Sequence, residues 1–120
     1  MLHKDSTLKC ACGCGYEPTK SAMWFLESLS RWYAVKFNKP MYVTSGARCY
    51  KHNATVGGVP NSAHTNGLAF DVAYFSSREC YEIVHHLYKM GVTRIGINFN
   101  KSFVHFDIDT DLPQNVLFKY

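Results

Sequence analysis

Ser62-Ala63-His64-Thr65-Asn66-Gly67-Leu68-Ala69-Phe70-Asp71 is the stretch that decides how this chain folds. It places the imidazole of His64 and the carboxylate of Asp71 seven residues apart, with Gly67 between them. Glycine allows a sharp turn at low steric cost, and the apolar residues that follow it predict a buried strand carrying Asp71. An ionised carboxylate is costly to bury alone, so we expect Asp71 to be paired, hydrogen-bonded or bound to a metal.

A second segment, Phe103-Val104-His105-Phe106-Asp107, offers that partner. Side chains alternate across a strand, so His105 and Asp107 share one face and the apolar residues between them point to the other. Two histidines and two aspartates on apolar segments favour a metal site. Three ligands, His64, Asp71 and His105, would leave a fourth position on a zinc ion open, as in catalytic sites. The other histidines are predicted not to bind metal: His3, His52, His85 and His86.

Length and charge limit the possible classes of protein. With 120 residues, 47% of them hydrophobic, the chain is predicted to form one domain over residues 1–120. The net charge of +4 comes from scattered Lys and Arg residues, which argues against nucleic-acid binding but suits an anionic polymer. No apolar run approaches the roughly 20 residues of a membrane span. The first eight residues lack the apolar core of a signal peptide, so we expect synthesis in a cytoplasm.

Periodicity predicts an α+β domain with a small, mainly antiparallel sheet packed against helices. Apolar residues recur every three or four positions from Pro18 to about Phe37, and a capping box at Ser76–Glu79 begins a second helix that ends at Gly91. Other predicted elements are a strand at 41–44, a short helical stretch ending at Val56, a loop at 57–62 and strands at 68–74, 93–98 and 102–108. The tail from Asp111 has too few signals to assign.

Five cysteines form an odd count, which argues against a closed disulfide framework. Cys10, Cys12 and Cys14 are packed together, whereas Cys49 and Cys80 stand apart. Reduced thiols are the favoured interpretation. A structural zinc site in the Cys-x-Cys-x-Cys segment stays open, although two-residue spacings suit a tetrahedral site better. In an oxidising compartment the segment could instead pair with Cys49 or Cys80, and the sequence does not choose between them.

Taken together, the motifs resemble the M15 family of zinc peptidases, most closely its short phage and prophage branch. The family includes D-alanyl-D-alanine carboxypeptidases and the L-alanyl-D-glutamate endopeptidases of phage endolysins. The resemblance extends over residues 8 to 110 and implies the fold shared with the Hedgehog signalling domain. It is carried by Thr44–Cys49, Asn53, Val56–Gly58, Ser62–Asp71, Ile95–Ile97 and Phe103–Asp107.

The resemblance implies a role for each site residue. His64, Asp71 and His105 correspond to the zinc ligands, and Arg48 to an arginine that binds substrate and stabilises the oxyanion. A guanidinium suits that role because it offers planar, permanently charged donors. Ser62, in the same Ser-x-His segment, is predicted to bind substrate.

The general base departs from the pattern of the better-known family members. They carry Glu, Asp or His two to three residues before the third ligand, where this chain has Ser102 and Phe103. Asp107 is therefore the best available base, and Asp109 the next. A swapped arrangement, with Asp107 as ligand and His105 as base, is disfavoured because imidazole suits zinc better than another hard oxygen in this site.

These inferences predict a zinc-dependent peptidoglycan peptidase, a carboxypeptidase or an endopeptidase, that hydrolyses stem peptides of the bacterial cell wall. We expect a monomer of phage or prophage origin, without stable membrane association, that acts at the cell wall as an endolysin or a virion component. The alternative is a non-catalytic module on the same fold that binds zinc or the cell wall. A nucleic-acid binder is the weakest interpretation, because the aromatic residues fall at core-like spacings.

Overall fold

The computed structural model describes residues 3–4, 8–58 and 62–120 of the chain. Of the predicted loop at 57–62, residues 59–61 lie outside the described residues. The helices are α1 (Lys20–Phe37), α2 (Tyr50–Thr55) and α3 (Ser77–Lys89), with a 3-10 turn, η1 (Ala63–Asn66). The strands are β1 (His3–Lys4), β2 (Met41–Ser45), β3 (Ala69–Ala73), β4 (Arg94–Asn98), β5 (Phe103–Asp107) and β6 (Val116–Lys119).

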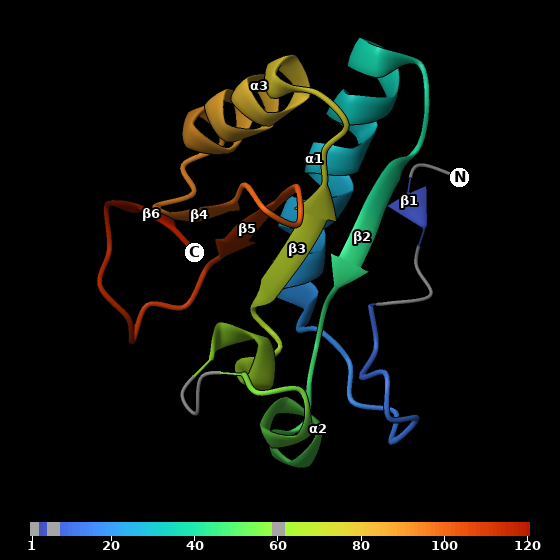
Figure 1. The fold of residues 1–120 in the computed structure, drawn as a ribbon, viewed down its shortest axis with the longest axis vertical. Coiled ribbons are helices and arrows are strands. Elements are labelled where there is room, and N and C mark those ends of the chain that lie inside the picture. The colour runs from blue at the N-terminus through green and yellow to red at the C-terminus, as the bar shows by residue number, and fades with distance from the viewer. Residues whose placement is uncertain (1–2, 5–7, 59–61) are drawn as a thin grey trace.

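The strands form one mixed sheet in the order β1-β2-β3-β5-β4-β6 (Figure 1). The three central pairings, β2 with β3, β3 with β5 and β5 with β4, are antiparallel. The two edge strands, β1 and β6, add in parallel. The structure thus confirms the predicted α+β class and the mainly antiparallel sheet.

The hydrophobic core lies between the sheet and the two long helices. Figure 1 shows α1 passing behind β2 and β3, and both α1 and α3 contribute fully buried apolar side chains to one cluster. The two central strands contribute Phe70 and Val72 of β3 and Val104 and Phe106 of β5 to this cluster. Because side chains alternate along a strand, Asp71 and His105 point to the opposite face of the sheet. The helices of the core do not cover that face, so it can carry a functional site.

Side-chain caps begin both long helices. The Thr19 hydroxyl accepts a hydrogen bond from the Ala22 amide at 3.1 Å, and the Ser76 hydroxyl accepts one from the Glu79 amide at 3.1 Å. The Glu79 carboxylate also joins the two helices. It accepts hydrogen bonds from Tyr33 Oη at 2.5 Å and Lys39 Nζ at 2.9 Å, which tie α3 to α1 and the turn after it.

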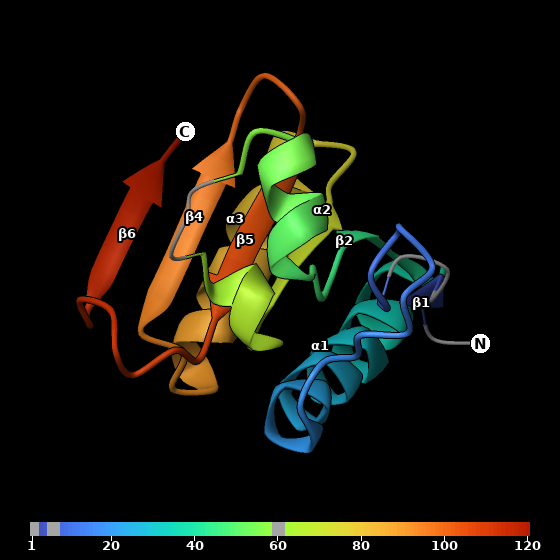
Figure 2. The ribbon, with the colours of Figure 1, turned by 90° about the horizontal axis from the view of Figure 1, so that it is seen from below.

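The C-terminal tail, which carries no clear sequence signal, forms β6 against β4 (Figure 2). Phe118 pairs with Gly96, where an added Cβ would come within 2.3 Å of the Phe118 ring. The glycine therefore lets the ring approach the sheet, and Phe118 packs 5.7 Å from the His105 ring between centroids. Among the described residues, none of the helices combines the length and apolar character needed to cross a membrane.

Candidate metal centre

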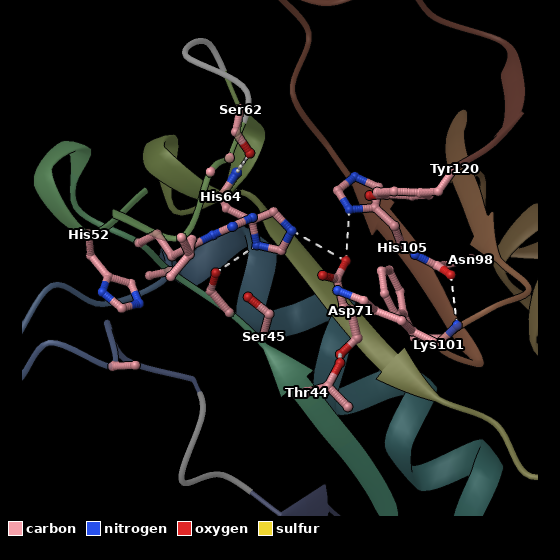
Figure 3. Close-up of a pocket in the computed structure, with 18 of the residues that line it drawn as sticks. Thr44, Ser45, His52, Ser62, His64, Asp71, Asn98, Lys101, His105 and Tyr120 are labelled. Carbon is pink, nitrogen blue, oxygen red and sulfur yellow. Dashed lines mark hydrogen bonds and ion pairs between the residues drawn. The ribbon is translucent and has the colours of Figure 1, made fainter. Parts of the chain in front are cut away.

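Three elements bring His64, Asp71 and His105 together, as the sequence predicts. Asp71 on β3 and His105 on β5 are directly paired across the antiparallel ladder. His64 comes from η1, which precedes β3 and lies over its start (Figure 3). The exposed fractions are only 2% for His64, 7% for Asp71 and 5% for His105. Their potential ligand atoms all lie within 4.8 Å of one another, close enough to share one ion.

The Asp71 carboxylate lies between the two imidazoles. Its Oδ1 is 2.9 Å from His105 Nδ1 and 3.3 Å from His64 Nε2. Burial alone would raise the pKa of Asp71, but the hydrogen bond from His105 and the proximity of the His64 ring outweigh burial and hold that pKa well below its usual range. Asp71 is therefore an anion at neutral pH, with one oxygen directed at both rings.

The orientation of His64 shows that this arrangement fits a cation. His64 Nδ1 donates a hydrogen bond to the Gly46 carbonyl at 2.7 Å, so in the neutral ring Nε2 carries a lone pair. Nε2 is buried and has no hydrogen-bond partner. A lone pair that faces a carboxylate oxygen at 3.3 Å is electrostatically unfavourable unless a positive charge lies between them. A divalent metal bound by His64, Asp71 and His105 would supply that charge.

His105 lies between two carboxylates. Its Nδ1 contacts Asp71, and its Nε2 contacts Asp107 Oδ2 at 2.7 Å. Burial lowers the pKa of His105, but the contacts with Asp107 and Asp71 more than reverse this effect, so the pKa is raised. Without a metal, a proton on His105 Nδ1 points at Asp71. A metal ion bound by Nδ1 and Asp71 would take the place of that proton, since metal binding displaces protons from ligand atoms.

Asp107 contacts the candidate ligand His105 but does not belong to the group that could bind the metal. It is 1% exposed, and its Oδ1 accepts hydrogen bonds from Arg94 Nε at 2.8 Å and the Asp109 amide at 3.1 Å. Its Oδ2 accepts a hydrogen bond from His105 Nε2. Asp107 is not among the residues that line the adjacent pocket. This carboxylate–histidine contact is the usual way in which proteins orient a metal-binding imidazole.

Asp109, the second predicted candidate for the base, is also occupied. Its Oδ2 accepts a hydrogen bond from Asn66 at 2.9 Å and its Oδ1 one from the Asp111 amide at 3.0 Å. These contacts link the segment after β5 to η1, so Asp109 helps to hold the turn that carries His64.

A pocket of about 680 Å³ opens beside the three candidate ligands (Figure 3). Arg48 and Ser62, the two residues predicted to bind substrate, both line it. The Arg48 amide donates to the His64 carbonyl at 3.0 Å, and Arg48 Nε is buried without a hydrogen-bond partner. Ser62 caps η1, where its hydroxyl accepts a hydrogen bond from the His64 amide at 3.1 Å. Ser62 thus positions His64, whatever else it binds.

The sequence did not predict that several other residues lie at or near the pocket. His52, predicted not to bind metal, lines the pocket from α2 but is not part of the His64–Asp71–His105 group. Tyr120 reaches the pocket from the end of β6, a strand without a sequence signal, and its ring centroid lies 6.3 Å from that of His105. Arg94, which holds Asp107, resembles any surface arginine in the sequence. Its role depends on the pairing of β4 with β5.

Gly67 ends η1 in the left-handed conformation, with φ at 68°, as expected for a turn between His64 and Asp71. We expect Gly67→Ala to destabilise the protein by about 1 to 2 kcal/mol, because a side chain disfavours this conformation. The added Cβ would also lie 3.1 Å from the Glu17 carbonyl oxygen. The variant should therefore displace His64 and weaken metal binding, which denaturant unfolding and zinc titration would measure.

Gly91→Ala is the matched control for Gly67→Ala. Gly91 has φ at 87°, but an added Cβ there meets nothing within 4 Å. Its substitution should cost similar stability and leave metal affinity unchanged. Equal metal affinity in the two variants would show that the Gly67 turn does not position His64.

Two histidines and an aspartate, gathered at the wall of an open pocket on an α+β fold, form a group that could hold a metal ion in a catalytic site. The family model of Peptidase M15 matches residues 3–107, and the chain belongs to this peptidase family. The predicted membership is thereby confirmed, and the α+β architecture agrees with a small M15 peptidase domain. A search of curated proteins finds no match to the chain.

Proposed function

We propose that the protein is a zinc-dependent peptidase that hydrolyses the stem peptides of bacterial peptidoglycan. The observation that carries the proposal is the Nε2 of His64, which is buried without a hydrogen-bond partner and faces Asp71 at the wall of an open pocket. Membership of the M15 peptidases supports it independently. Two imidazoles and one carboxylate form a donor set suited to catalytic zinc.

His64 Nε2, Asp71 and His105 Nδ1 would hold the ion. When bound, zinc supplies a Lewis acid and lowers the pKa of a coordinated water to about 7. The residues of the chain orient the ligands: a hydrogen bond to the Gly46 carbonyl fixes the ring of His64, and a hydrogen bond to Asp107 fixes the ring of His105. Both rings are therefore set before the ion arrives.

Two donors in the pocket are placed to bind substrate. Arg48 offers a permanently charged guanidinium for a substrate carboxylate or for the oxyanion that develops during hydrolysis. Burial and the nearby Asp71 raise the pKa of Tyr120, so its phenol keeps its proton at neutral pH and can donate a hydrogen bond. We assign oxyanion and substrate binding to Arg48, with Tyr120 as a second donor.

The charge of the pocket favours an anionic substrate. Arg48, Lys101 and Lys9 line it, whereas Asp71 is the only carboxylate among the described lining residues. Stem peptides carry free carboxylates, so a pocket of this charge would attract them and repel cationic peptides. This complementarity supports peptidoglycan as the substrate class.

The structure leads us to propose a different role for Asp107 from the base that the sequence favours. Both of its oxygens are engaged, and it lies behind His105 rather than in the pocket. A base must reach the proton that it removes. We therefore propose Asp107 as a positioning residue for His105, and this also argues against the swapped arrangement with Asp107 as ligand.

A non-catalytic zinc- or wall-binding module is the second candidate function. The observation that favours it is the absence, among the described lining residues, of any carboxylate other than the candidate ligand Asp71. Such a module would bind peptidoglycan through Arg48 and the lysines without turnover.

Incubation of the purified protein with peptidoglycan, followed by mass spectrometry of the soluble products, separates the two functions. We expect soluble peptides with new amino termini from an endopeptidase, or free D-alanine from a carboxypeptidase; these products should be lost after chelation and return when zinc is restored. The identity of the new terminus would show whether the cleaved bond is D-Ala-D-Ala, L-Ala-D-Glu or a cross-bridge. Binding to sacculi without new termini, in protein loaded with zinc, would contradict the peptidase and support the module.

The biological setting is proposed from the sequence resemblance. We propose a monomer of phage or prophage origin that acts on the cell wall as an endolysin or virion component and makes no stable association with nucleic acid or membrane.

A further inference from the structure

Four cysteines gather at a second place in the molecule. Cys10, Cys12 and Cys14 lie on the loop that precedes α1, and Cys49 is the residue that caps α2. Their sulfur atoms all lie within 4.8 Å of one another, although Cys49 is 39 residues from Cys10 in the chain. We call these four residues the cysteine cluster. The fifth cysteine, Cys80, is buried on α3 and is not part of it.

The separations between the sulfurs match a single tetrahedral ion. A zinc–sulfur bond of about 2.3 Å places the corners of an S₄ tetrahedron about 3.8 Å apart. The Sγ atoms of Cys10, Cys12 and Cys49 are separated by 3.3, 3.6 and 3.7 Å. A disulfide would need about 2.05 Å, and all five cysteines are free. An iron–sulfur cluster would need wider spacing, because several irons and sulfides lie between the thiolates.

The backbone around the cysteine cluster is arranged for thiolates. The Cys49 amide donates to Cys10 Sγ at 3.4 Å, and the His52 amide donates to Cys49 Sγ at 3.4 Å. Hydrogen bonds of this kind stabilise negative charge on sulfur. Gly13 has φ at 84°, which lets the chain reverse between Cys12 and Cys14. The tight one-residue spacing is therefore compatible with a common centre.

We infer that Cys10, Cys12, Cys14 and Cys49 bind one structural zinc ion, separate from the ion of the His64–Asp71–His105 site. Four thiolates form the closed, soft donor set that is typical of structural zinc and leaves no position for a substrate. The chain would then bind two zinc ions of different chemistry: one open, with nitrogen and oxygen ligands, and one closed, with sulfur ligands.

The position of the cysteine cluster suggests what this ion would do. Cys49 follows Arg48 directly, and Lys9 and Ala11 of the cysteine loop line the same pocket as Arg48. Hydrogen bonds at both ends of the loop tie it to the rest of the fold: the Ala47 amide donates to the Leu8 carbonyl at 2.9 Å, and Tyr16 Oη donates to the Thr65 carbonyl at 2.5 Å. An ion that joins the loop to Cys49 would fix one wall of the pocket and the backbone that carries Arg48. This positioning role rests on the proposed function; zinc binding by the cysteine cluster does not.

Metal analysis of the intact protein, purified under reducing conditions, tests the inference. We expect two zinc ions per chain in the wild type, one in the double variant Cys12→Ser/Cys14→Ser and one in His64→Ala. Cys12 and Cys14 are exposed, so their replacement removes no core contact. Cys80→Ser is the control that removes a thiol outside the cysteine cluster, and it should keep both ions.

Cobalt substitution identifies the ligands without relying on activity. Cobalt bound to His64→Ala should give the intense near-ultraviolet bands of thiolate coordination, and these bands should be lost in Cys12→Ser/Cys14→Ser. Absence of both metal and these bands in folded, fully reduced His64→Ala would overturn the inference. So would a disulfide among the four cysteines in freshly prepared wild-type protein, as shown by mass spectrometry.

The positioning role has its own readout. Loss of the second ion in Cys12→Ser/Cys14→Ser should raise KM for peptidoglycan fragments more than it lowers kcat, because the reacting centre is unchanged while the Arg48 wall loosens. An unchanged KM would contradict this role. A wild type that binds two ions but cleaves nothing would overturn the proposed peptidase and leave the structural zinc intact.

Discussion

Asp71→Asn is expected to remove the metal ion held by His64 and His105 and to abolish hydrolysis. Asp71 is the only anionic member of this ligand set, and its Oδ1 lies within 3.3 Å of both imidazoles. Asparagine has nearly the same shape, so the pairing of β3 with β5 should persist. The loss in metal affinity should exceed the roughly 10- to 100-fold that is typical when a residue behind a ligand is changed. Zinc content and muropeptide release measure the two effects.

Asp111→Asn is the matched control, because Asp111 is an exposed carboxylate in the segment after β5 and does not belong to the candidate ligands. It should retain the full metal content and activity. Because the cysteine cluster is proposed to hold its own ion, the expected change in Asp71→Asn is the loss of one zinc and not of all zinc. Full activity in Asp71→Asn would contradict the site.

Asp107→Asn is expected to weaken zinc binding by about 10- to 100-fold without removing any ligand. The Asp107 carboxylate accepts a hydrogen bond from His105 Nε2 and so directs Nδ1 toward Asp71. An asparagine can offer its amide group to the ring and favour the wrong tautomer. Competition with a zinc chelator measures the affinity, and activity at saturating zinc should be largely restored.

The outcome also separates the three roles considered for Asp107. A base would keep zinc and lose turnover even at saturating metal, whereas a ligand would lose the ion outright. Loss of the negative charge also leaves Arg94 without its buried partner, so unfolding should be measured in the presence of a chelator to separate stability from metal affinity. Unchanged zinc affinity would refute the positioning role proposed here.

Much of the fold can be predicted from local patterns. The helix expected over Pro18 to about Phe37 is found at Lys20–Phe37, and the helix after Ser76 begins at Ser77 as its cap predicts. Such patterns succeed because apolar periodicity and helix caps act over a few residues. The alternation that placed His105 and Asp107 on one face is confirmed by their hydrogen bond.

Non-local features escape the same reasoning. β6 has little periodicity, and it forms because its backbone pairs with β4, where Gly96 leaves room for Phe118. The turn η1, which orients His64, lies in a stretch predicted only as the approach to a strand. The cysteine cluster depends on Cys49, which lies far from the other three cysteines in the chain. The sequence favoured reduced thiols and left metal binding and disulfide pairing as alternatives.

The sequence by itself determined the family, the α+β class and the three candidate ligands, because these depend on residue types at short, ordered spacings. Only the tertiary structure decided which groups surround those ligands: Asp107 behind His105, Arg94 behind Asp107, Tyr120 at the pocket and Cys49 beside the other three cysteines. The physical reason is that strand pairing and loop packing join residues far apart in the chain, and local preferences do not encode such distances.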